Sequence, residues 1–245
     1  MDKGQYNYNR LKIYDTSMYP SMKQEDFLKK NHIMFLEMDL DSYEKYISFT
    51  EDYLDNTAEE YQKKHLDSLK DDTIDWEITK EYKEKMFEVD GNFAQRFRES
   101  IIVQLYSFFE RALLNSCEMY NSNKEMNENY FNGIGSKAGF EEAKIFLKKK
   151  AIITLNDLNP ELDFFSKLST LRNRIVHHKT AHFYDEEKKI NDIRALSKNW
   201  YIFQEKNNFL TTYFIHFDKP EFSFEIINKI KTFYRKLGEK EVYYL

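Results

Sequence analysis

The sequence predicts an all-α protein, a bundle of antiparallel helices with one small β-hairpin near the C-terminus. Gly (6) and Pro (3) are scarce in the 245 residues, whereas turn-dense β folds need many of both at their bends. Hydrophobic residues make up 41% and aromatic residues 17% of the chain, which supplies bulk for a core and argues against general disorder. Apolar residues recur at steps of three or four over most of the chain, the spacing of helices with one buried face.

Residues 1–90 are expected to form an N-terminal arm followed by an acidic helical extension. The first 25 residues lack periodicity and are interpreted as the arm. Helices are predicted at residues 26–54, 58–69 and 74–89. Asp90-Gly91 is expected to end the third of these helices, because glycine is a common helix stop.

Residues 91–245 are expected to form the main helical domain. Its strongest helix is predicted at residues 93–120, where the apolar stripe is wide enough for burial on more than one side. The polar residues 121–135 are interpreted as a loop. The next helix carries Phe140, Ala143 and Leu147 and ends in the basic run Lys148-Lys149-Lys150.

A helix is then predicted from Asn159 to about His178, with Asn159 as its N-cap and Pro160 at its first helical position. Residues 200–217 break the helical pattern and indicate the hairpin. A final helix carries Phe224 to Leu237, with Ser223 or Glu221 as its expected cap.

The charge of the chain is unevenly distributed. The net charge is −5 at pH 7, which is not the basic footprint of a duplex-DNA binder. Residues 37–90 hold 18 Asp and Glu against 7 Lys, whereas residues 136–182 hold 9 Lys and Arg against 5 Asp and Glu. A polyanion should therefore prefer the second region. The plain alternative for both regions is a solvated helix surface.

The sequence predicts a soluble, cytoplasmic protein with no membrane contact. No apolar run approaches the roughly 18 residues that suggest a membrane span. Residues Met1 to Tyr6 carry no signal-peptide pattern. Cys117 is the single cysteine, so an intrachain disulfide is excluded and a cysteine-based zinc site is not expected.

Common catalytic motifs are missing from the sequence. It contains no His-Glu-x-x-His zinc motif, no phosphate-binding glycine loop and no Gly-x-Ser-x-Gly nucleophile turn. His32, His65 and His216 are isolated in the sequence, and each is expected to be an ordinary surface or core histidine. No cofactor and no metal site are predicted.

One segment, residues 171–179 (LRNRIVHHK), does carry unusual chemistry for a single helix. Asn173 and His177 are four residues apart, about 40° around the helix, and can touch. Arg172 offers a fixed positive fork for phosphate, and His177 offers a proton that moves near neutral pH. An arginine with a histidine suits metal-free RNA cleavage, which needs a base, an acid and a cation for the charged phosphorane. The alternative is that these cations only stabilise the C-terminal end of the helix dipole.

Arg172-Asn173 followed by His177 resembles the R-x(4–6)-H motif of the HEPN superfamily, whose commonest form has Asn after the Arg. The motif lies late in a helix, as in that family. The earlier long helix holds Tyr106 to Glu110, similar to the helix in many HEPN proteins where Ser or aromatic residues precede a Glu. The resemblance covers residues 93–237, so residues 1–90 would be a family-specific extension. It implies a HEPN-like helical bundle.

The resemblance also implies roles for individual residues. Arg172 would stabilise the scissile phosphate, His177 would transfer protons, and Asn173 would orient His177 or the phosphate. Glu110 would anchor Arg172 or polarise the imidazole, unless it is an ordinary solvated or capping acid. Further residues would support the cleft or bind RNA, unless they are solvated helix surface: Arg174, His178, Lys148, Lys149, Lys150 and Lys179.

The sequence leaves three hypotheses for the function. The first is a metal-independent HEPN endoribonuclease that acts as a homodimer on RNA, in toxin–antitoxin or antiviral defence, with a cognate antitoxin or regulatory protein as a further partner. The second is a non-catalytic HEPN module that binds nucleotides or a protein. The third is a helical scaffold in which the Arg/His cluster is structural. For the first, the acidic residues 37–90 would shield the cleft or select RNAs.

Overall fold

The computed structural model describes residues 24–69, 76–123, 139–149 and 154–240, and these are mostly helical, with a small antiparallel sheet. The predicted arm, residues 1–23, lies outside the described residues, as do residues 124–138, which hold most of the predicted loop. Asn121 to Asn123, also assigned to that loop, instead extend the preceding helix.

The first described helix, α2 (Gln24–Ser68), replaces the two helices predicted at 26–54 and 58–69. Residues 55–57 contain neither Gly nor Pro, so nothing ends the helix there. The hydroxyl of Thr57 donates to the backbone oxygen of Tyr53 at 2.7 Å, one turn earlier, and so does not compete with the helical ladder.

The second rod of the molecule consists of α3 (Trp76–Met86), a π-helical turn (Phe87–Phe93) and α4 (Ala94–Asn123). The prediction that Gly91 ends a helix is wrong. A glycine stop uses a left-handed conformation, and no described glycine has a positive φ. The chain therefore continues through the wider π turn into α4.

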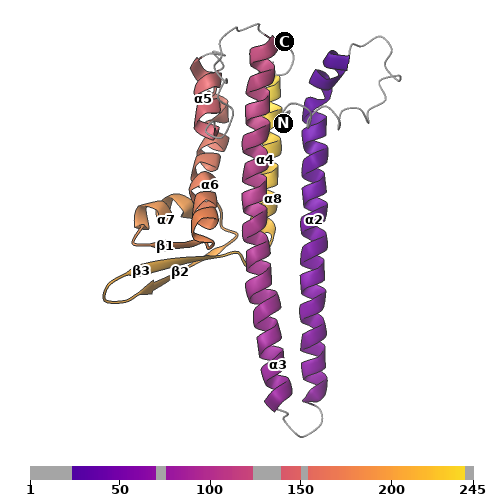
Figure 1. The fold of residues 1–245 in the computed structure, drawn as a ribbon, viewed down its shortest axis with the longest axis vertical. Coiled ribbons are helices and arrows are strands. Elements are labelled where there is room, and N and C mark those ends of the chain that lie inside the picture. The colour runs from indigo at the N-terminus through magenta and orange to yellow at the C-terminus, as the bar shows by residue number, and fades with distance from the viewer. Residues whose placement is uncertain (1–23, 70–75, 124–138, 150–153, 241–245) are drawn as a thin grey trace, which may run out of the picture.

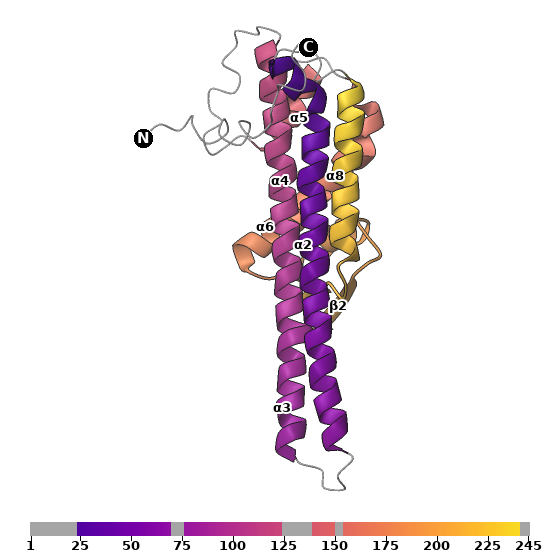
Figure 2. The same cartoon turned by 90° about the vertical axis from the view of Figure 1, so that its right-hand side faces the viewer.

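The two rods are antiparallel and lie side by side, and their joined ends project well beyond the other elements (Figure 1). The last helix, α8 (Glu221–Glu239), packs against the upper halves of α2 and α4 (Figure 2). On another side of α4 lie α5 (Phe140–Lys149) and α6 (Asn159–His178), the second of which follows a short 3₁₀ turn (Asn156–Leu158).

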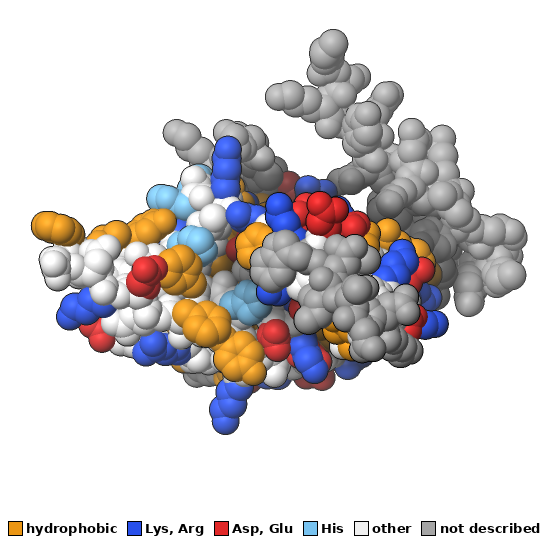
Figure 3. Space-filling model, turned by 90° about the horizontal axis from the view of Figure 1, so that it is seen from below, with side chains coloured by type: hydrophobic (Ala, Val, Ile, Leu, Met, Phe, Trp, Pro, Cys, Tyr) orange, Lys and Arg blue, Asp and Glu red, His pale blue; other side chains and the backbone are white. Residues whose placement is uncertain are grey.

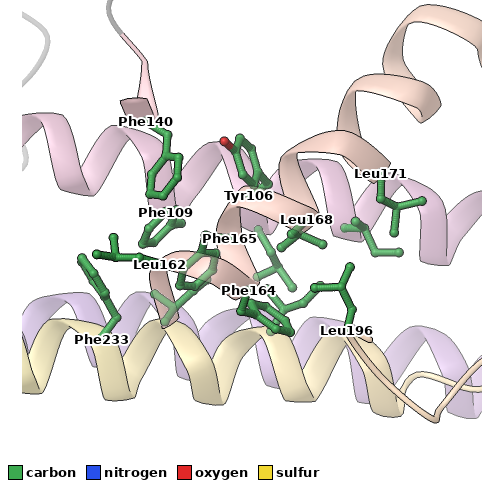
Figure 4. Close-up of a cluster of buried hydrophobic side chains, with 14 of the residues drawn as sticks. Tyr106, Phe109, Phe140, Leu162, Phe164, Phe165, Leu168, Leu171, Leu196 and Phe233 are labelled. Carbon is green, nitrogen blue, oxygen red and sulfur yellow. The ribbon is translucent and has the colours of Figure 1, made fainter. Parts of the chain in front are cut away.

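The core is centred on Phe109 of α4, where four helices meet (Figure 4). Its ring stacks on Phe165 of α6, with centroids 3.6 Å apart, and meets the edge of Phe233 of α8 at 5.3 Å. Phe140 of α5 completes the cluster at 5.7 Å. Burial of such aromatic rings is the main source of stability that holds α6 against α4.

The upper part of α2 belongs to this same core, because Leu36, Leu40 and Ile47 are buried in it. Acidic side chains of α2 are paired there with cations of α8. Lys231 Nζ lies 2.8 Å from a carboxylate oxygen of Asp41, and the same distance from one of Glu44. The expected division at residue 90 falls inside the π turn; whether the two parts have separate functions stays a prediction.

A three-stranded antiparallel sheet lies beside the bundle, in the strand order β1-β3-β2. The predicted hairpin is confirmed as β2 (Tyr201–Lys206) and β3 (Thr211–His216). Strand β1 (His182–Tyr184) and helix α7 (Glu187–Arg194) were not predicted. A three-residue strand is too short to show an alternating pattern, and only its pairing with β3 defines it.

The predicted helix caps differ from those observed. Leu158 precedes α6 as its N-cap residue, so Asn159 is already helical and makes no side-chain cap. Pro160, predicted at the first helical position, lies at the second, because the helix begins at Asn159. Pro220 precedes α8, so Glu221 and Ser223 fall within that helix and neither caps it.

Candidate functional site

The Arg/Asn/His motif lies in the last two turns of α6, as predicted. One face of this helix is buried in the core through five side chains: Leu162, Phe165, Leu168, Leu171 and Ile175. The last turns also carry Asn173, His177 and His178, whose side chains are exposed to solvent. Core packing thus fixes the helix while it presents the polar groups outward.

Arg172 lies against α4. Its guanidinium carbon is 5.6 Å from the centre of the Tyr106 ring, a cation–π contact, and Nη1 donates to Asn173 Oδ1 at 2.8 Å. Burial raises the pKa of Tyr106 to about 12, so its ring stays uncharged beneath the guanidinium at neutral pH. These contacts hold Arg172 at the surface without neutralising it.

The charge of Arg172 is the distinctive feature of the site. Four other arginines, Arg96, Arg98, Arg174 and Arg235, form ion pairs with glutamates, whereas the exposed Arg111 and Arg194 have no ion pair within the described residues. Arg172 has no carboxylate partner among the residues that the structure describes. An unneutralised guanidinium, on the helix end that also carries exposed imidazoles, is a group that a phosphate can pair with.

Asn173 makes a different contact from the one expected. Its side-chain oxygen is bonded to Arg172, and no hydrogen bond links it to His177 within the described part of the chain. The amide therefore orients the guanidinium rather than the imidazole. His177 is exposed on the next turn, and His178 follows it.

Arg174 lies on another side of α6, in the packing between that helix and the sheet. It forms an ion pair with Glu186, and its guanidinium carbon lies 4.6 Å from the centre of the Phe183 ring. Burial lowers the pKa of Arg174. This placement makes Arg174 a structural clamp rather than the cleft residue that the sequence suggested.

Glu110 serves as a capping acid, the alternative that the sequence left open. Its Oε1 accepts a hydrogen bond from the backbone N–H of Phe140 at 3.0 Å, at the start of α5, where a negative charge suits the helix dipole. No ion pair joins it to Arg172 among the described residues, and Tyr106 is the α4 side chain that contacts Arg172.

The end of α6 is held by side chains of α4 that sequence reasoning missed. Lys179 ends the helix in a left-handed conformation, with φ at 58°, and its carbonyl accepts a hydrogen bond from Arg96. Two residues later, the N–H of Ala181 donates to Oε1 of Glu99 at 3.2 Å. Arg96 also pairs with Glu99 at 3.0 Å.

The same turns of α4 hold the end of β3 and the chain that follows it. Gln95 donates to the Ile215 carbonyl at 3.1 Å and accepts from the Phe217 N–H at 2.9 Å. Arg98 donates to the Phe217 carbonyl at 2.8 Å and pairs with Glu51 of α2, Nε to Oε1 at 2.9 Å, where both side chains are buried. The sequence did contain a signal for these contacts. Gln95, Arg96, Arg98 and Glu99 form a polar cluster at the start of a helix that is otherwise rich in apolar residues.

The lysines expected to bind RNA are only partly described. Lys148 is exposed near the end of α5, the side chain of Lys149 is not described, and Lys150 lies outside the described residues. Lys179 is exposed directly after the motif. The described residues contain no group of three His, Cys, Asp or Glu side chains placed to share a metal ion.

Comparisons with known proteins do not assign this chain to a family. No family model, curated protein or solved structure matches the chain. None of the helices in the described part of the chain combines the length and the apolar character that crossing a bilayer requires. The chemistry of this chain must therefore be inferred from the residues of the site and their geometry.

Proposed function

We propose that this chain is a metal-independent endoribonuclease of HEPN type, with Arg172 and His177 as its catalytic residues. The observation that carries the proposal is the unneutralised, partly exposed guanidinium of Arg172 on the same helix end as the exposed imidazole of His177. The HEPN-like motif supplies the expectation, and the solvent access of these groups supports it.

The reaction divides into three tasks. A base removes the proton of the ribose 2′-OH, and O2′ then attacks phosphorus. Arg172 stabilises the charged phosphorane, and an acid protonates O5′ as the P–O5′ bond breaks. The products are a 2′,3′-cyclic phosphate on one fragment and a 5′-OH on the other. Asn173 holds the guanidinium through its 2.8 Å bond and acts as a positioning residue.

Two proton transfers require two groups, whereas one motif supplies one His177. We therefore propose a homodimer in which two α6 ends face each other across one cleft, so that the second His177 fills the second role. His178 and Lys179 extend the positive, protonatable surface on each side. A toxin–antitoxin or antiviral role, with a protein that restrains the nuclease, is part of this proposal.

The test is cleavage of single-stranded RNA by purified protein in EDTA, beside His177→Ala and Arg172→Ala. Matched controls are His65→Ala, which removes a ring stacked on Tyr82 in the projecting rods, and Arg111→Ala, which removes an exposed arginine of α4. We expect the wild type and both controls to cleave, and both site variants to lose at least about a hundredfold in rate. Equal cleavage by all five proteins contradicts the proposal, and RNA binding without cleavage favours a non-catalytic module.

A further inference from the structure

The sheet has one face turned toward the helices and one turned away from them. Phe183 of β1 and Tyr213 and Ile215 of β3 are buried on the inner face. Because directly opposed residues in an antiparallel sheet point to the same side, the register assigns the remaining positions. The outer face carries eight side chains: His182, Tyr184, Tyr201, Phe203, Glu205, Thr212, Phe214 and His216.

Six of these eight outer side chains are aromatic or imidazole rings, and we call these six the ring platform. Tyr201 and Phe203 are each 57% exposed and Tyr184 is 44% exposed, while the other three rings are partly exposed. Seen from below, hydrophobic and histidine side chains gather on the side of the molecule that carries the sheet (Figure 3). Such an exposed group of rings marks a binding surface.

Three pairs of these rings lie close together, one within β2 and two across neighbouring strands. The centroids of His182 and Phe214 are 4.6 Å apart, those of Tyr201 and Phe203 are 6.3 Å apart, and those of Phe203 and His216 are 6.4 Å apart. Burial lowers the pKa of His182, which favours the uncharged form of this ring. The result is a group of neighbouring rings, tilted or edge-on to one another, on the outer face of the sheet.

The platform is continuous with the catalytic helix. Strand β1 begins at His182, four residues after the end of α6 at His178. Arg96 lies at the junction, bonded to the carbonyl of Lys179, with more than half of its side chain exposed. Lys179 is exposed beside it. Along the chain, the exposed cation of Lys179 thus lies between His177 and the first ring, His182, whereas Arg96 is paired with Glu99.

We propose that the ring platform binds single-stranded RNA by stacking two or more unpaired bases, beside the cleavage site at the end of α6. This inference rests on the proposed nuclease function and names the form of its substrate. Sheets that bind single strands use exposed aromatic rings for bases and nearby cations for phosphates. The exposed cation of Lys179, three residues before His182, suits the phosphates of a polyanion and favours RNA over a second copy of this chain.

The test measures binding of a fluorescent single-stranded RNA of about ten nucleotides to the full chain carrying His177→Ala, which removes cleavage. Each base stacked on a ring contributes on the order of tenfold in affinity, so Phe203→Ala and Tyr201→Ala should each weaken binding about tenfold. Phe203→Trp keeps a ring and should retain the affinity. Phe209→Ala, which removes a ring that is 94% exposed at the hairpin tip outside the platform, is the matched control.

An abasic ribose-phosphate strand of the same length separates stacking from charge. It should bind more weakly, and its affinity should not change with Phe203→Ala. Equal RNA affinity of Phe203→Ala and Phe209→Ala overturns the proposal. So does a Phe203→Ala protein that no longer dimerises but keeps its RNA affinity per site, because the platform would then bind a second copy of the chain.

The platform and the nuclease function fail in different ways. Ring-dependent RNA binding without cleavage by the protein with intact His177 would refute the nuclease and leave the platform standing. Cleavage that Phe203→Ala and Tyr201→Ala leave unchanged, with unchanged affinity, would refute the platform alone.

Discussion

Glu99 of α4 accepts a hydrogen bond from the backbone N–H of Ala181, with 3.2 Å between Oε1 and nitrogen, and so holds the chain where it leaves the motif helix. Glu99 is 4% exposed, and Arg96 pairs with its other oxygen. The chain between His178 and β1 is therefore held by a carboxylate built into the second rod of the bundle. The orientation of the exposed histidines depends on α4 as well as on α6.

Replacing Glu99 tests this connection. Glu99→Ala leaves the buried N–H of Ala181 without its acceptor, so the free energy of unfolding should fall by about 1–3 kcal/mol. RNA cleavage should fall as well, because the end of α6 loses its support, with the larger effect on kcat. Glu99→Gln keeps an acceptor and should restore much of both. Urea unfolding and steady-state cleavage measure the two effects, and wild-type values for Glu99→Ala would show that the contact positions nothing.

Arg172 and Arg174, two residues apart, should separate stability from activity. Arg174→Ala leaves the partly buried Glu186 with only the exposed Lys189 as a partner and removes the contact with Phe183, so it should lower the free energy of unfolding by about 1–2 kcal/mol. Arg172→Ala loses only a cation–π contact and one exposed hydrogen bond, less than about 1 kcal/mol, yet should abolish cleavage. Thermal unfolding and cleavage assays on both variants check this, and the reverse pattern would exchange the roles assigned to the two arginines.

Cys117 should report global unfolding. Its side chain is fully buried in the core, and burial raises the pKa of the thiol, so the reactive thiolate is suppressed. We expect a thiol reagent to modify the native protein only at the rate of unfolding and to modify it rapidly in concentrated urea. Rapid modification of the native protein would show that α4 and α5 separate locally at this point.

His32 should make stability depend on pH. Burial lowers the pKa of its imidazole from 6.5 to about 4 in the folded chain, so the unfolded chain binds a proton more readily. Its contribution is fully present above the unfolded pKa and is lost as pH falls toward 4, about 2 kcal/mol between pH 7.5 and 5. His32→Gln should lose less stability over that interval in urea unfolding; an identical loss would show that other groups cause it.

The sequence predicted most of the helices because their apolar residues recur at helical spacing. The end of α6 at His178 and the hairpin at β2 and β3 followed from periodicity and its interruption. The continuation of α3 into α4 was missed because the sequence does not show which backbone conformation Gly91 adopts. Strand β1 was missed because it is defined by its pairing with β3, a contact between residues far apart in the chain.

The site was only partly predictable for the same reason. Arg172 and His177 are close in the sequence, so their position on one helix end could be predicted. The contacts of the other candidate residues depend on how the helices and strands pack together. Arg174 pairs with Glu186, and Glu110 caps α5, through contacts that no local spacing encodes. The ring platform likewise appears only when β1 pairs with β3 and places His182 opposite Phe214.

The most direct measurement is the chemistry of the RNA ends after cleavage in EDTA, with one substrate of ordinary RNA and one carrying a 2′-deoxy sugar at the cut site. The account predicts a 2′,3′-cyclic phosphate and a 5′-OH from the first substrate, no cut at the modified position of the second, and neither product from His177→Ala. A 5′-phosphate end, cleavage at the 2′-deoxy position, or undiminished cleavage by His177→Ala would contradict it.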